Sequence, residues 1–185
     1  LLVRLEPSLS AGMIQGLDYL EHYPYECTEQ TISSFLPNIY TARALADLDV
    51  HHTVLSTELD TQINDAIGRL RQDQEPDGGW SWCGGDVDPS QPYTSAYALF
   101  GLISARNAEY TVEDKVLVDG ARYLRRQLKS PDQLKGEALN LQAFIVYVLD
   151  EYARLAGTEQ PLVETQSLFG ERERLAHYAQ AYLVL

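Results

Sequence analysis

Two side chains near the start of the sequence, Cys27 and Gln30, have the types and the spacing needed to bond to each other. They are separated by Thr28 and Glu29, and the run from Thr31 to Leu48 is suited to a helix. In the first turn of a helix, residues three apart lie on one face, so the sulfur of Cys27 can meet the side-chain carbonyl of Gln30. A thiolate that attacks this amide expels ammonia and leaves an internal thioester.

The neighbouring sequence favours this arrangement. Pro24 prevents a helix from running through from the N-terminal side, so the helix is expected to begin near Cys27. A helix N-terminus favours negative charge and lowers the pKa of a thiol there below its free value of about 8.5. Two alternatives for Cys27 are an ordinary buried thiol and a bridge to the second cysteine, Cys83. If the thioester forms, Cys83 is expected to be a sheltered free thiol.

The stretch from Tyr23 to Asn38 resembles the thioester motif of the alpha-2-macroglobulin and complement family, in particular of its bacterial members. That motif is Pro-Tyr-x-Cys-x-Glu-Gln, followed by a helix with Phe-Leu-Pro or Ala-Pro-Asn. The resemblance assigns the thioester to the cysteine and glutamine. The family usually has glycine before the cysteine, where this chain has Glu26, which would be strained if the turn needs a positive φ. The matching positions are Pro24, Tyr25, Cys27, Glu29, Gln30, Phe35, Leu36, Pro37 and Asn38.

Composition excludes several classes of protein. The 185 residues suffice for one domain with a real core, and we expect a single domain over residues 1–185 with its motif at 23–38. The formal net charge of -13 argues against nucleic acid or an anionic membrane surface as partner. No apolar run approaches the roughly twenty residues of a membrane span. The chain begins with Leu1 rather than Met, so we expect a piece of a longer protein.

Apolar residues recur at helical spacing, and no segment shows convincing period-two alternation, which predicts an all-α fold. Similar helices recur at roughly forty to fifty residues, a length suited to helical hairpin repeats. The family resemblance implies an α/α toroid, with an incomplete ring in a chain of this length. Pro37 predicts a bend or a break near Leu36. The apolar stripes lie at residues 59–70, 93–103, 117–128, 141–152 and 175–183.

Residues 74–92 are rich in glycine and proline and predict a long loop. Its start, from Gln74 to Trp80, matches the Q-x-x-x-G-x-W signature that recurs in triterpene cyclases. We expect a structural role, with Gln74 capping a helix end and Trp80 and Trp82 packed under the loop. Asp86 and Asp88 form a D-x-D pair in this loop, and we expect them to be solvated acids rather than a metal site.

The function implied by the resemblance is a protease trap. A protease cuts a bait segment elsewhere in the parent chain, the thioester is uncovered, and a Lys amine of the protease attacks the Gln30 carbonyl. Cys27 leaves as thiolate, and Tyr23 and Tyr25 are the local candidates to keep water out beforehand. The event is single-use, so no enzyme is expected, and no cofactor or metal is implied. The expected partners are target proteases and the remaining domains of the parent chain, in the periplasm, at the cell envelope or outside the cell.

Some complement relatives use a downstream histidine to pass the acyl group to a hydroxyl. That histidine precedes the helix that corresponds to residues 141–152, and the stretch 130–138 contains none. We therefore assign no catalytic histidine to this chain. Two other functions remain open: an isoprenoid cyclase-like enzyme on an α/α toroid, and a helical-repeat binding module with an inactive motif. The four histidines are His22, His51, His52 and His177.

Overall fold

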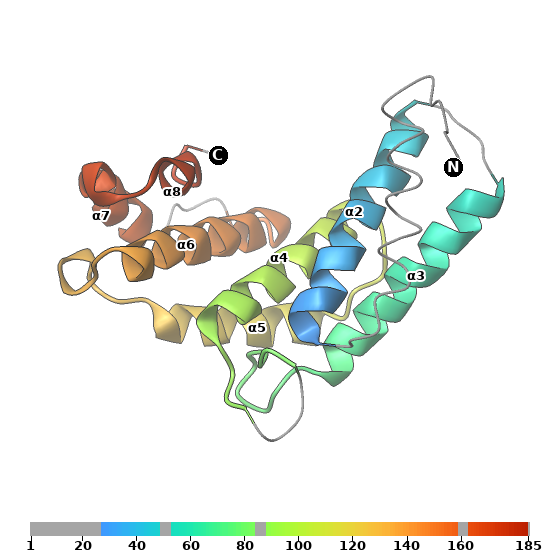
Figure 1. The fold of residues 1–185 in the computed structure, drawn as a ribbon, viewed down its shortest axis with the longest axis horizontal. Coiled ribbons are helices and arrows are strands. Elements are labelled where there is room, and N and C mark those ends of the chain that lie inside the picture. The colour runs from blue at the N-terminus through green and yellow to red at the C-terminus, as the bar shows by residue number, and fades with distance from the viewer. Residues whose placement is uncertain (1–26, 49–52, 84–87, 159–162, 185) are drawn as a thin grey trace, which may run out of the picture.

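A computed structural model describes residues 27–48, 53–83, 88–158 and 163–184 of the chain (Figure 1). All regular structure within these ranges is helical, which confirms the all-α prediction. None of the helices described is long and apolar enough to span a bilayer. The α-helices are α2 (Thr28–Asp47), α3 (Thr53–Gln72), α4 (Pro92–Asn107), α5 (Asp114–Gln127), α6 (Glu137–Leu155), α7 (Val163–Gly170) and α8 (His177–Ala181), with short 3₁₀ helices at Pro131–Gln133 and Arg172–Arg174.

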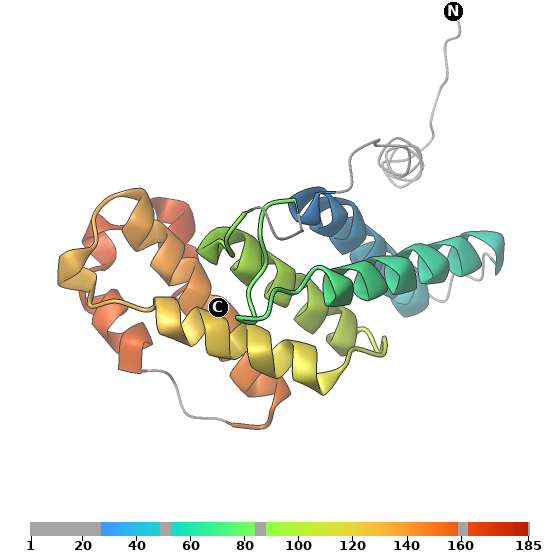
Figure 2. The ribbon, with the colours of Figure 1, turned by 90° about the horizontal axis from the view of Figure 1, so that it is seen from below.

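The helices pack as hairpins in two rows. In one row α2 packs against α4 and α4 against α6. In the other, α3 packs against α2 and α4, and α5 packs against α4 and α6, while α7 and α8 both pack on α6. Figures 1 and 2 show the described helices following an open arc with α3 and α5 on one side of it. This alternation of rows is the architecture of an α/α toroid, as the sequence predicted.

The described residues form two apolar cores, and the larger one lies between helices α2 to α6. Phe35 of α2, Leu99 of α4 and Leu149 of α6 are among its fully buried side chains. A smaller core joins α6 to α7 and α8 through Leu139, Leu168 and other residues. The predicted stripe at 175–183 contributes Leu175 and Ala179 to this smaller core. Helix α7 was not predicted from the sequence, because its eight residues are too few to display a periodic stripe.

Helix α2 continues as an α-helix through Pro37, so the helix does not break near Leu36. Packing explains the tolerance, because Phe35, Leu36 and Ile39 around the proline are buried in the larger core. The next motif position is also structural. Asn38 is buried, and its side-chain nitrogen donates a 2.7 Å hydrogen bond to Gln62 of α3. The Phe-Leu-Pro-Asn part of the motif therefore fixes the α2–α3 hairpin.

The loop after α3 is held by a fully buried tryptophan. The indole nitrogen of Trp80 donates a 2.7 Å hydrogen bond to the carbonyl of Leu70, in the last turn of α3. The predicted cap by Gln74 is wrong: its side-chain nitrogen instead bonds the carbonyls of Gly78 and Val116, each at 3.0 Å, and ties the loop to α5. The cap on α3 thus comes from Trp80, and the signature is structural, as expected.

Candidate functional site

Cys27 is the N-cap of α2, and Gln30 is the third residue of the helix. Cys27 has extended backbone angles of φ -67° and ψ 146°, and its carbonyl accepts the first helical hydrogen bond, from the Thr31 amide at 2.9 Å. Cys27 through Gln30 therefore form the first turn, as predicted. The side-chain oxygen Oε1 of Gln30 is buried and has no hydrogen-bond partner among the described residues.

In the structure, Cys27 forms a disulfide with Cys83. The expectation that Cys83 is a sheltered free thiol is wrong: it is exposed and bonded, while Cys27 is half-buried. The two Cα atoms lie 3.8 Å apart, so the backbones of the loop and of the helix start touch. Because one sulfur cannot carry both bonds, a Cys27–Cys83 disulfide and a Cys27–Gln30 thioester exclude each other.

The loop that carries Cys83 lies across the N-terminus of α2. The amide of Glu29 donates a long 3.5 Å hydrogen bond to the carbonyl of Trp82. Trp80 fixes the loop two residues earlier, since its amide donates to Ser95 Oγ at 2.8 Å and its carbonyl accepts from the Gln91 amide at 2.8 Å. Trp82 itself is 42% exposed, so the expectation that both tryptophans pack under the loop holds only for Trp80.

Buried hydroxyl groups without a partner concentrate around this junction. Thr28, Ser81 and Thr94 are fully buried, and none of their hydroxyl oxygens has a hydrogen-bond partner among the described residues. Thr28 follows Cys27, Ser81 precedes Trp82, and Thr94 precedes the Ser95 that holds Trp80. An unpaired buried polar group costs about 1–3 kcal/mol, so stability alone does not account for these three.

Glu29, a motif position, links the start of α2 to an aromatic groove. Its Oε1 accepts a 2.8 Å hydrogen bond from Ser33 Oγ, which lies 3.5 Å from the hydroxyl of Tyr97. Burial raises the pKa of Tyr93, and the neighbouring Tyr97 and the charge of Glu29 raise it further. The i,i+4 spacing of Glu29 and Ser33 was visible in the sequence, but the contact with Tyr97 was not. The groove, of about 570 Å³, is lined mainly by aromatic side chains: Tyr93, Tyr97, Phe100, Phe144, Tyr147, Tyr178 and Tyr182.

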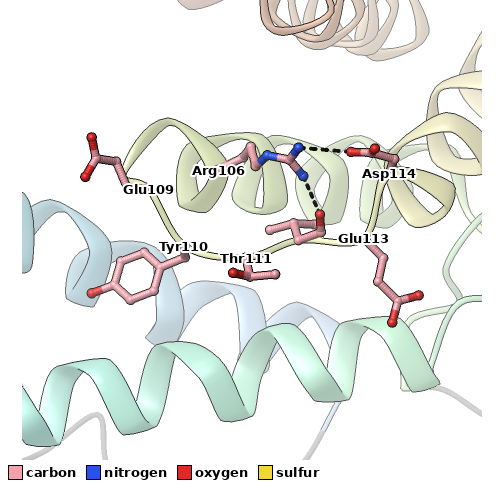
Figure 3. A pocket seen from close by; sticks show the side chains of 7 residues that line it. Arg106, Glu109, Tyr110, Thr111, Glu113 and Asp114 are labelled. Atoms are coloured by element: carbon pink, nitrogen blue, oxygen red, sulfur yellow. Dashed lines mark hydrogen bonds and ion pairs between the residues drawn. The ribbon is translucent and has the colours of Figure 1, made fainter.

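A second hollow lies at the connection between α4 and α5 (Figure 3). Its central charge is already paired, because Arg106 forms a 3.0 Å ion pair with Asp114 and donates to the carbonyl of Val112. Nearby, the hydroxyl of Tyr110 donates a 2.6 Å hydrogen bond to Asp60 of α3. These contacts hold the α4–α5 connection in place.

The other predicted site residues divide into two groups. Asp88 is exposed, and His177 is exposed at the start of α8. No group of three or more potential metal ligands occurs in the part of the chain that the structure describes. The remaining predicted positions lie outside the described residues: Pro24, Tyr25, Tyr23, Glu26, His22, His51, His52 and Asp86.

The chain is similar in sequence to a known protein family and to its curated bacterial members. A family model described as the A-macroglobulin TED domain matches residues 5–167. Among curated relatives, the chain is 31% identical over 171 residues to an alpha-2-macroglobulin of Xylella fastidiosa, which covers 88% of this chain and 10% of the relative. It is 30% identical over 141 residues to the alpha-2-macroglobulin of Escherichia coli, covering 70% of this chain and 8% of the relative.

Solved structures agree with the sequence relatives. Native E. coli alpha-2-macroglobulin superposes with a TM-score of 0.68 at 25% identity, over 89% of this chain and 10% of that one. A Salmonella alpha-2-macroglobulin reacted with methylamine gives a TM-score of 0.68 at 26% identity, over 92% of this chain and 11% of that one. The chain thus spans about a tenth of the length of these relatives. It belongs to the A-macroglobulin TED domain family, the thioester-domain family of the bacterial alpha-2-macroglobulins.

Proposed function

We propose that Cys27 and Gln30 form an internal thioester that couples covalently to amines. The observation that carries the proposal is the position of the pair. Cys27 is the N-cap of α2, Gln30 lies in the first turn, and the carbonyl oxygen of Gln30 is buried without a hydrogen bond. The helix N-terminus stabilises the Cys27 thiolate, which is both the nucleophile that forms the bond and the group that leaves when the bond opens.

The coupling step follows from this arrangement. A neutral amine attacks the Gln30 carbonyl carbon, the carbon–sulfur bond breaks, and Cys27 leaves as thiolate at the helix N-terminus. The amine loses a proton and becomes the nitrogen of a new amide on Gln30. A related Salmonella protein has been solved after reaction with methylamine, which supports amines as the class of nucleophile. The thioester is consumed once, so the domain does not turn over as an enzyme.

Thiol titration in a Cys83→Ser variant tests the thioester, because Cys27 is then the only cysteine of the chain. We expect Cys27 to resist a thiol reagent in the freshly purified, unheated protein. Methylamine should then release one titratable thiol and add one methylamine at Gln30, located by peptide mass. A thiol that titrates fully before methylamine is added would contradict the thioester and favour a helical-repeat module with an inactive motif.

In a parent chain of the length of its relatives, we propose that the domain traps proteases. Cleavage of that chain would uncover the thioester, and a Lys amine of the attacking protease would take the place of methylamine. Such a trap meets foreign proteases in the periplasm, at the cell envelope or outside the cell. The support is membership of a family whose curated bacterial members are alpha-2-macroglobulins.

Denaturing electrophoresis of the full-length protein after exposure to trypsin tests the trap. We expect a protease conjugate that survives denaturation and disappears in the Gln30→Ala variant, which lacks the acyl carbon. Methylamine treatment before trypsin should abolish the conjugate in the wild-type protein as well. Equal conjugate in the wild-type and Gln30→Ala proteins would show that the attachment does not pass through Gln30.

A further inference from the structure

The disulfide between Cys27 and Cys83 gives the thioester cysteine a second covalent partner. We propose that this pair is a redox switch, in which oxidation to the disulfide removes Cys27 from thioester chemistry and the thioester in turn protects Cys27 from oxidation. The inference rests on the proposed thioester, since it concerns the fate of the same sulfur atom. The partner chemistry is that of a small disulfide acting as oxidant.

Hydrogen bonds on both sides of the loop hold Cys83 close to Cys27. Trp80 is fully buried three residues before Cys83, and its amide, carbonyl and indole nitrogen are all hydrogen-bonded. The Tyr123 hydroxyl also donates a 2.9 Å hydrogen bond to the carbonyl of Ser90 on the returning side of the loop. Because the loop is held on both sides, the two sulfurs stay close, and their reaction is intramolecular.

The environment of the two cysteines suits thiol–disulfide exchange. Cys27 lies at the N-terminus of a 20-residue helix, where a thiolate is stabilised. Cys83 is exposed and Cys27 is half-buried, so a small disulfide can reach the pair. Exchange rates depend on the thiolate fraction of the attacking group and on access to it, and both conditions are met here.

The chemistry balances with one small disulfide, R–S–S–R, as oxidant. The Cys27 thiolate attacks one of its sulfurs, forms a mixed disulfide and releases R–S⁻. The Cys83 thiolate then attacks the Cys27 sulfur and releases the second R–S⁻. Two electrons pass from the protein to the reagent, and the protons of the two protein thiols end on two R–SH molecules. While the Cys27 sulfur is acylated by Gln30, the first attack cannot occur.

Two consequences follow from this exclusivity. Oxidation before the thioester forms leaves the domain unable to couple. Oxidation after an amine has opened the thioester removes the thiolate that could attack the new amide at Gln30, so the captured amine cannot be released by reversal. The disulfide therefore prevents thioester formation in an unreacted domain and prevents release of the amine from a reacted one.

Oxidised glutathione is the probe that tests the switch, with intact mass and peptide mapping as the readout. The chain is first purified with a phosphine reductant, which is then removed. We expect untreated wild-type protein to form no Cys27–Cys83 link with oxidised glutathione, and any glutathione taken up to be on the exposed Cys83 alone. After methylamine treatment the wild-type protein should lose two hydrogen atoms in mass and yield a Cys27–Cys83 linked peptide. The Gln30→Ala variant should form the same link without methylamine, and methylamine-treated Cys83→Ser should instead keep glutathione on Cys27.

Two results would overturn the switch, and they have different origins. If untreated wild-type protein forms the disulfide as fast as Gln30→Ala, no thioester protects Cys27, and the proposed function fails with it. If methylamine opens the wild-type protein but the product carries glutathione on Cys27, as in Cys83→Ser, then Cys83 is not its partner. In that second case the thioester itself remains supported.

Discussion

The chemistry of Cys27 depends on which neighbour its sulfur bonds, Gln30 or Cys83. The position of Cys27 and Gln30 in one helical turn was predictable, because Pro24 and the helix-forming run after Cys27 fix where α2 starts. The contact with Cys83 was not predictable. It depends on how a glycine-rich loop 56 residues away in sequence is folded back by Trp80 onto the start of α2. Spacing within one helix is local information, whereas the contact between Cys83 and Cys27 depends on tertiary structure.

The thioester should react with amines and hardly at all with alcohols. The one histidine in the described part of the chain, His177, is exposed at the start of α8, and no histidine lies in residues 130–138. Attack must then be direct, and an amine is a far better direct nucleophile than an alcohol. Competition between methylamine and glycerol, followed by mass, should give almost only the amide. Efficient glycerol ester formation would contradict this, and its loss in His22→Ala would identify the missing relay.

At the scale of elements, hydrophobic periodicity sufficed for the long helices and failed for the short ones. The stripe Leu117, Ala121 and Leu124 predicted α5, and all three side chains are buried. Helix α3 starts at Thr53, before the apolar stripe predicted at residues 59–70. In the loop from Gln74 to Trp80, the tryptophan rather than the glutamine bonds the end of α3. Hydrophobic periodicity cannot predict such a hydrogen bond.

Gly78 should be essential to the loop that carries Cys83. It has a φ of +89°, and an added Cβ would lie 2.4 Å from the backbone oxygen of Asp119. Gly78→Ala should therefore lower the free energy of unfolding by about 1–3 kcal/mol or more, measured by urea denaturation. The matched control is Gly68→Ala in α3, where nothing lies within 4 Å of the new Cβ. That control should be neutral or stabilise by about 0.5–1 kcal/mol. Equal effects at both positions would contradict the assigned role.

The hydrogen bond from Tyr110 to Asp60 makes the α3 contact sensitive to alkali. Burial first, and then the hydrogen bond and charge of Asp60, raise the pKa of Tyr110. Since the folded-state pKa is the higher one, this contribution to stability is complete below about pH 10 and is lost as the pH rises through the folded-state value. The urea midpoint of wild-type protein should therefore fall more steeply above about pH 10 than that of Tyr110→Phe. Identical slopes would show that the bond does not contribute.

At the scale of the whole molecule, the described helices form consecutive hairpins along an open arc (Figure 1). The repeat spacing of similar helices and the family resemblance together predicted this architecture. The sequence did not predict that Leu168 of α7 would share the smaller core with Leu175 of the last stripe. That packing depends on a short helix whose apolar residues are too few to show a period.

The Cys27–Cys83 disulfide should stabilise the chain, because it closes a loop between residues 56 apart in sequence. Loop-closure entropy for that length corresponds to a stabilisation of at most about 4 kcal/mol. Reduction by a phosphine should lower the urea midpoint of the oxidised wild-type protein. The same reductant should leave the midpoint of Cys83→Ser unchanged. A wild-type midpoint that does not respond to reduction would contradict a disulfide joining the loop to α2.

Intact mass spectrometry of freshly made, unheated protein tests the thioester most directly. The chain is purified with a phosphine reductant, which keeps Cys27 and Cys83 from forming a disulfide without supplying a competing thiol. The thioester predicts a wild-type mass below the sequence mass by one ammonia, a gain of one methylamine on treatment, and a Gln30→Ala variant at its full sequence mass. A wild-type protein at its full sequence mass, with Cys27 freely alkylated and no uptake of methylamine, would contradict it.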